Sequence, residues 1–106
     1  MNSLALGKQT YDKKELQDIL SRSDAKTDAS VLLAGQLIAT KLNLANHSNP
    51  APVSNTIKDA DQQFAQFPGK LPYKVKPGSE IGQAMINDAS TLREYNHGGL
   101  SDNCIP

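Results

Sequence analysis

The stretch that decides the fold is Gln36-Leu37-Ile38-Ala39-Thr40-Lys41-Leu42-Asn43-Leu44-Ala45-Asn46. It closes a long amphipathic run that begins near Asp28, in which leucines and other apolar residues recur at helical spacing. The apolar stripe is broad, which is typical of a central helix that contacts several neighbours. The run therefore predicts a helix that begins after Asp28 as N-cap and ends near Asn46.

Two further helices are expected, one before and one after this central helix. Asp12 and Glu15 have the spacing of a capping box, and they predict a helix over about residues 12–21. After the central helix, Asn49-Pro50 has the pattern of an N-cap followed by proline at the first helical position. This pattern and the apolar stripe behind it predict a helix over about 50–67.

A fourth helix is expected to begin at Ser79 as N-cap and to end at Asn96-His97-Gly98-Gly99. Residues 68–78, which we call the strap, contain three prolines and two glycines. Such a composition predicts an extended connection laid over the helices, because proline lowers the entropy cost of fixing a long loop. Residues 1–11 are expected to be an extended lead-in, and residues 99–106 a C-terminal tail.

The sequence thus predicts an all-α fold, a compact four-helix domain over residues 1–106 with the Pro-rich strap between helices three and four. A chain of 106 residues forms one domain and buries roughly 65% of its unfolded surface, which is enough for a single core. The expected core consists of Leu16, Ile19, Leu20, Leu33, Leu37, Ile38, Leu42, Ile57, Phe64, Ile81, Met85 and Leu92.

Composition argues against several classes of partner. The eleven basic and eleven acidic residues give a formal net charge of zero, and no block of five or more like charges exists. A nucleic-acid-binding protein is therefore not expected. No apolar run approaches the roughly 20 residues of a membrane-spanning helix. The N-terminus lacks the basic and apolar regions of a signal peptide, so we expect either a cytoplasmic protein or one whose leader has been removed.

No catalytic motif is recognisable, so neither an enzyme nor a bound cofactor is expected. His47 and His97 lie just beyond helix ends and are expected to be turn residues. A metal site or small enzyme that uses both histidines and Cys104 is the least favoured alternative, because structural zinc needs four ligands. Asp59 and Asp61, two positions apart on a helix, should point in different directions and form a solvated face.

Two residues suggest covalent modification. Cys104 is the only cysteine and cannot form a disulfide within this chain. It is either an unpaired thiol of the tail or bonded to another chain or to an upstream segment. Asn46-His47-Ser48 matches the acceptor pattern for N-glycosylation, which matters only in a secretory context.

Four residues of the strap are candidates for an interface. Lys70, Lys74 and Lys76 either serve solubility or form a modest basic patch for an acidic partner. Tyr73 lies among them. It either contacts a partner, as tyrosine often does at interfaces, or pins the strap to the core.

A family resemblance covers nearly the whole chain. It is carried by Leu4-Ala5-Leu6-Gly7, Tyr11–Leu20, Asp28-Ala29-Ser30 and Gln36–Asn46, and by Thr56–Asp61, Val75–Ser79, Gly82-Gln83 and Leu92–Asn96. In these segments the chain resembles a small helical module that recurs at or near the C-termini of secreted or surface proteins of bacteria and some fungi. The most specific block is Gln36–Asn46. The chain departs from the family at His47, where glycine is usual, and at His97, where asparagine is common.

The resemblance implies an extracellular location and no established activity. With the absence of catalytic motifs, it leads to the hypothesis of a non-enzymatic extracellular structural or interaction module. Such a module would be an assembly or attachment subunit of a surface structure, joined to a protein partner or to further copies through Cys104 and the tail. The alternative is a carrier of a small apolar ligand between helices, lined by Phe64, Phe67, Tyr73 and Met85.

Overall fold

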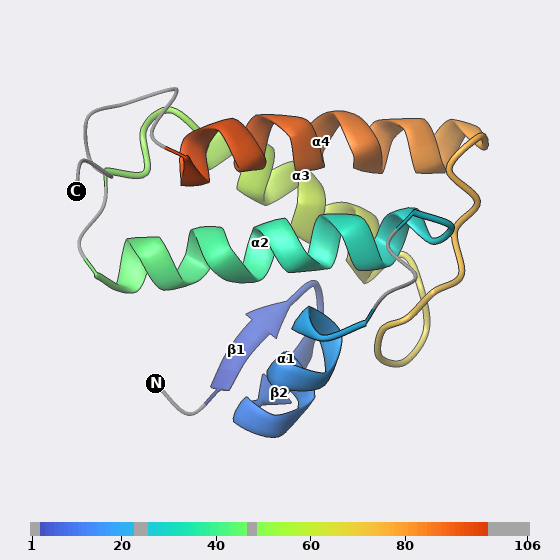
Figure 1. Ribbon diagram of the computed structural model, residues 1–106, viewed down its shortest axis with the longest axis horizontal. Coiled ribbons are helices and arrows are strands. Elements are labelled where there is room, and N and C mark those ends of the chain that lie inside the picture. Colours follow the sequence, from blue (N-terminus) through green and yellow to red (C-terminus); the bar gives the residue numbers. More distant parts are fainter. Residues whose placement is uncertain (1–2, 23–25, 47–48, 98–106) are drawn as a thin grey trace.

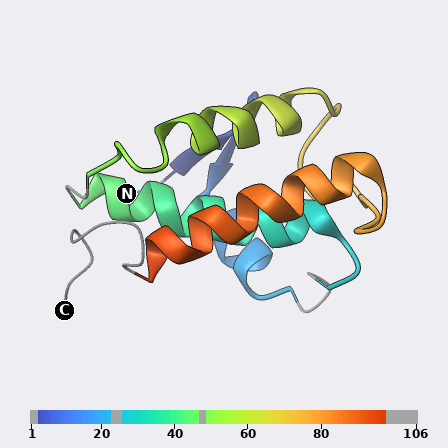
Figure 2. The ribbon, with the colours of Figure 1, turned by 90° about the horizontal axis from the view of Figure 1, so that it is seen from above.

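The computed structural model describes residues 3–22, 26–46 and 49–97. The elements are β1 (Ser3–Leu6), β2 (Gln9–Asp12), α1 (Lys13–Leu20), α2 (Ala29–Ala45), α3 (Ser54–Ala65) and α4 (Glu80–Asn96). The central helix α2 lies between α4 on one side and the two strands with α1 on the other (Figure 1). Seen from above, α3 and α1 lie on opposite sides of the pair formed by α2 and α4 (Figure 2).

The prediction of an all-α fold is wrong, because the expected lead-in contains a β-hairpin. Strands β1 and β2 pair in antiparallel register, with Leu6 opposite Gln9 at the turn. Gly7 has φ +66°, a left-handed conformation that glycine adopts without strain in two-residue hairpin turns. Each strand has only four residues, so its alternation is too short to be told from a loop by sequence alone.

The hairpin belongs to the core. Leu6 and Tyr11 are 0% and 1% exposed, and they join the same hydrophobic cluster as the helices. The Gly7 amide donates to Asp61 Oδ1 of α3 over 2.8 Å. A Cβ atom at Gly7 would lie 2.8 Å from the Cβ of Phe64, so the turn approaches α3 as closely as glycine permits.

Three helices begin and end close to their predicted bounds. The N-caps Asp12, Asp28 and Ser79 are confirmed. The capping box of α1 is also confirmed, since Asp12 and Glu15 each accept a hydrogen bond from the other's backbone amide. His97 is the C-cap of α4.

Helix α3 is shorter than the predicted range of 50–67. Asn49 caps a turn rather than a helix, because its Oδ1 accepts from the Ala51 amide over 3.1 Å. The helix itself begins only at Ser54. Pro52 accounts for the delay, since a proline disfavours helical backbone at the residue before it, here Ala51.

The expected core is correct for most of its members. Leu20, Leu42 and Ile81 are exceptions, with exposed fractions of 52%, 37% and 48%, and Ile57 is only half-buried. Leu20 and Leu42 line one pocket of about 200 Å³ between α1 and α2, so these two helices do not bury them against each other. Buried side chains that the prediction omitted are Leu6, Tyr11, Ala29, Val31, Ala34, Val53, Ala60, Val75, Ala89 and Tyr95.

The strap is fastened to the beginning of α2 by the carboxylate of Asp28, which is 5% exposed. Asp28 Oδ1 accepts from Ser30 Oγ (2.6 Å), from the Ser30 amide (3.0 Å) and from the Val75 amide (3.0 Å). Its Oδ2 accepts from the amide of Lys74, which has φ +55°. Ser30 Oγ in turn accepts from the Tyr73 amide over 3.0 Å.

The first prediction concerns the hairpin turn. We expect Gly7→Ala to lower the free energy of unfolding by at least about 2 kcal/mol, because it adds left-handed strain and a clash with Phe64. Gly35→Ala is the matched control, since Gly35 lies in α2 and nothing lies within 4 Å of the added Cβ. It should stabilise by up to about 1 kcal/mol. Urea denaturation measures both, and equal effects would contradict the turn geometry.

The second prediction concerns the fastening of the strap. Asp28→Ala leaves several buried donors without an acceptor, and we expect it to cost about 3 kcal/mol or more. Asp12→Ala removes an exposed N-cap whose side chain accepts from the Glu15 amide of its own helix, and it should cost about 1 kcal/mol. Chemical denaturation of both variants tests the difference, and a similar loss in each would show that Asp28 acts as a cap alone.

Candidate functional site

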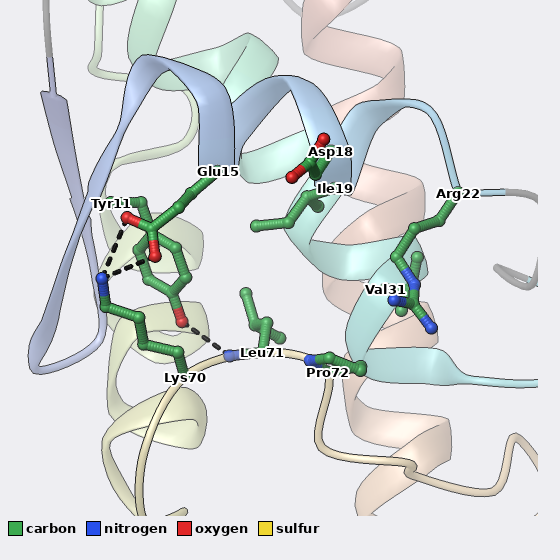
Figure 3. Close-up of a pocket in the computed structure, with 9 residues that line it drawn as sticks. All are labelled: Tyr11, Glu15, Asp18, Ile19, Arg22, Val31, Lys70, Leu71 and Pro72. Carbon is green, nitrogen blue, oxygen red and sulfur yellow. Dashed lines mark hydrogen bonds and ion pairs between the residues drawn. The ribbon is translucent and has the colours of Figure 1, made fainter.

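A pocket of about 220 Å³ lies where α1, the end of β2, the start of α2 and the strap meet (Figure 3). We call it the α1–strap pocket. Its floor is apolar and consists of Ile19, Val31, Leu71 and Pro72. Ile19 and Val31 are buried, whereas Leu71 and Pro72 are half-buried. The pocket thus unites side chains from segments that lie far apart in the sequence.

One wall of the pocket is held by three contacts of the strap with Glu15 of α1 and Tyr11 of β2. Lys70 Nζ forms an ion pair with Glu15 Oε2 over 2.8 Å and lies 5.1 Å from the centroid of the Tyr11 ring. The Leu71 amide donates to the Tyr11 hydroxyl over 2.8 Å. The hydrogen bond from Lys70, followed by that from the Asp12 amide, lowers the pKa of Glu15.

The opposite part of the rim comes from the end of α1. Asp18 and Arg22 are both exposed and both line the pocket. Arg22 already has an interaction of its own. The Asp18 carboxylate accepts no hydrogen bond from the part of the chain that the structure describes, although its backbone carbonyl accepts from Ser21 Oγ. Asp18 therefore retains unused acceptor capacity at the mouth of the pocket.

Tyr73 was a candidate interface residue, and its contacts favour the other alternative, that it pins the strap. Its ring stacks on Phe67 with centroids 4.7 Å apart and an interplanar angle of 11°. Its hydroxyl donates to the Gly69 carbonyl over 2.9 Å. Burial, and then the Tyr11 hydroxyl, raise the pKa of Tyr73.

The three strap lysines have different surroundings. Lys70 lines the α1–strap pocket, and its charge is compensated by Glu15. Lys74 and Lys76 are exposed. The backbone of Lys74 contributes to the fold through its amide, which binds Asp28. The basic patch considered from sequence is therefore reduced, because one of its three charges is paired.

The residues proposed for covalent modification and metal binding are only partly described. His47, Ser48 and Cys104 lie outside the described residues. Asn46 is the exposed C-cap of α2, and His97 lines a separate pocket at the end of α4. Within residues 3–22, 26–46 and 49–97, no group of three histidine, cysteine, aspartate or glutamate side chains could hold a metal ion.

The four residues named for an apolar ligand pack against one another or in the core. Phe64 and Met85 are 1% and 0% exposed. The ring of Tyr73 contacts that of Phe64, with centroids 5.8 Å apart, and that of Phe67. Five pockets of the described part of the chain are lined by other side chains. In this structure the four side chains thus pack against protein atoms, and the carrier hypothesis stays a prediction.

Asp59 and Asp61 do point in different directions, as predicted, but both have partners. Asp61 forms an ion pair with Lys41 over 2.9 Å and accepts from the Gly7 amide. Asp59 Oδ2 accepts from Gln63 Nε2 over 3.0 Å. These contacts show that the face is not simply solvated. Gln63 lies one turn further along α3, whereas the partners of Asp61 come from other elements and could not be foreseen.

Sequence reasoning missed a pair of carboxylates between α3 and α4. Gln63 Nε2 donates to Asp88 Oδ2 over 2.7 Å as well as to Asp59. Burial, followed by the nearby Asp59 carboxylate, raises the pKa of Asp88 to about 7, although the Gln63 hydrogen bond acts in the opposite direction. The only signal in the sequence is that each aspartate lies on a helix, which does not reveal that the two helices bring them together.

The third prediction is a pH dependence of stability. Because the folded state raises the pKa of Asp88 from 3.8 to about 7, it holds a proton that the unfolded chain releases. This contribution to stability is complete below about pH 4 and is lost as the pH rises to about 7. We expect Asp88→Asn to remove that loss in urea denaturation between pH 4 and 8. Asp18→Asn is the control, and an unchanged slope in Asp88→Asn would contradict the assignment.

Comparisons of this chain with protein-family models, curated proteins and solved structures find no match. Among the described residues, no helix combines the length and apolar character needed to cross a membrane. What the protein does is therefore inferred from its own sequence and from the geometry of the α1–strap pocket.

Proposed function

We propose that the protein is a non-enzymatic interaction module that acts outside the cell or at the cell surface, as an assembly or attachment subunit. Its protein partner binds at the α1–strap pocket. The observation that carries this proposal is the combination of an apolar floor with a charged rim. Protein interfaces have the same arrangement, with an apolar centre surrounded by polar residues.

The contacts around the pocket support binding without rearrangement. The Tyr11 hydroxyl holds Leu71, and the ion pair of Glu15 with Lys70 closes one wall. Asp28 fastens the strap a few residues further on. A site that is already formed loses less conformational entropy on binding, which favours its use for recognition.

The extracellular part of the proposal is supported by the sequence resemblance, whose most specific block is Gln36–Asn46. In such a setting Cys104 would bond to another chain. Asn46, exposed at the end of α2, would be open to glycosylation.

The fourth prediction tests both partner and location in the source organism. A photo-crosslinking benzoylphenylalanine replaces Arg22 at the rim of the pocket or, as the control, Asn87 on the exposed surface of α4. We expect a discrete crosslinked species, in the extracellular or surface fraction, from position 22 and none from position 87. Mass spectrometry then identifies the partner.

Two results would overturn the proposal. Equal crosslinking from positions 22 and 87, or none from either, would remove the pocket as the interface. A protein found only in the cytosol, with Cys104 fully reduced, would remove the extracellular role.

A further inference from the structure

We infer that the α1–strap pocket binds a tyrosine side chain of the partner protein, with the ring on the apolar floor and the phenolic hydroxyl donating to the Asp18 carboxylate. This inference rests on the proposed function and specifies the chemistry that the partner must present. It follows from the size of the pocket, its floor and the charges on its rim.

The size of the pocket suits one aromatic ring. Its volume is about 220 Å³. A cavity of roughly 150 Å³ is enough to bind benzene in a protein interior. The α1–strap pocket therefore has room for a six-membered ring with a hydroxyl group, whereas a single small aliphatic side chain would leave much of it empty.

The floor provides apolar contacts on both sides of such a ring. Ile19 and Val31 come from α1 and α2, and Leu71 and Pro72 come from the strap (Figure 3). An aromatic side chain gains a large buried area while it fixes only two torsion angles. Tyrosine keeps a polar tip at the mouth of a pocket, which suits a site that has an apolar floor and an exposed edge.

The rim favours a neutral hydrogen-bond donor over a charged group. It contains two acids, Glu15 and Asp18, and two bases, Arg22 and Lys70. A full charge on the ligand would be attracted by one pair and repelled by the other. A neutral hydroxyl avoids that repulsion, and it can use the free acceptor capacity of Asp18 to form a strong O–H···O⁻ hydrogen bond.

The fifth prediction uses methyl NMR of the whole chain titrated with N-acetyl-tyrosinamide, N-acetyl-phenylalaninamide and N-acetyl-lysinamide. We expect the tyrosine probe to shift the methyl signals of Ile19, Val31 and Leu71. Those of Leu20 and Leu42, in the other apolar pocket, should stay in place. The tyrosine probe should bind roughly tenfold more tightly than the phenylalanine probe, as one hydrogen bond to a charged group allows.

A pair of variants isolates the hydrogen bond. Asp18→Ala should reduce the affinity for the tyrosine probe to that for the phenylalanine probe, because it removes only the acceptor. Glu80→Ala removes an exposed acid of α4 outside the pocket and should leave the tenfold ratio unchanged. The spectra themselves report whether each variant is folded.

Several outcomes would overturn the inference. These are no shift of the pocket methyls by any probe, equal affinity for the tyrosine and phenylalanine probes, a ratio unchanged in Asp18→Ala, or tighter binding of the lysine probe. A crosslink from position 22 without a tyrosine preference would overturn only the ligand chemistry. Tyrosine binding without any crosslink would instead overturn the proposed protein partner.

Discussion

The hydrogen bonds accepted by the Asp28 carboxylate are the contacts on which the rest of the structure depends. The carboxylate caps α2 and at the same time accepts from the amides of Lys74 and Val75, which lie 46 and 47 positions further along the chain. A buried carboxylate is unfavourable unless it is fully hydrogen-bonded, and this one accepts from four donors. The hydrogen bonds are charge-assisted and therefore stronger than those between neutral groups.

The backbone of the strap is locally strained where its amides donate to Asp28. Lys74 has φ +55°, a conformation that costs an ordinary residue roughly 1–2 kcal/mol. Successive amides in such a turn form a concave anion site, which is occupied here by a side chain of the protein itself. Because this end of the strap is fixed at α2, Leu71 and Pro72 are held against α1, and the pocket between them is formed before any partner binds.

A second set of contacts places the hairpin. Lys41 of α2 binds both the Ala5 carbonyl and Asp61 of α3, and Asp61 also binds the amide of Gly7. The turn of the hairpin is thereby joined to two helices. The register of β2 then positions Tyr11, whose hydroxyl holds the strap at Leu71. The pocket is consequently supported on one side by the contacts of Asp28 with the strap and on the other by those of the hairpin.

The sequence alone determined three of the helices, α1, α2 and α4, with their caps Asp12, Asp28 and Ser79, because these depend on contacts within about four residues. It could not determine the hairpin, the α1–strap pocket or the carboxylate pair of Asp59 and Asp88. Each of these needs partners that are distant in the chain. Asp28 has one role of each kind. Its role as the N-cap of α2 was predicted, whereas its hydrogen bonds to the amides of the strap were not. Local spacing reveals which residue begins a helix, whereas only the packed chain decides which distant backbone amides reach the same carboxylate.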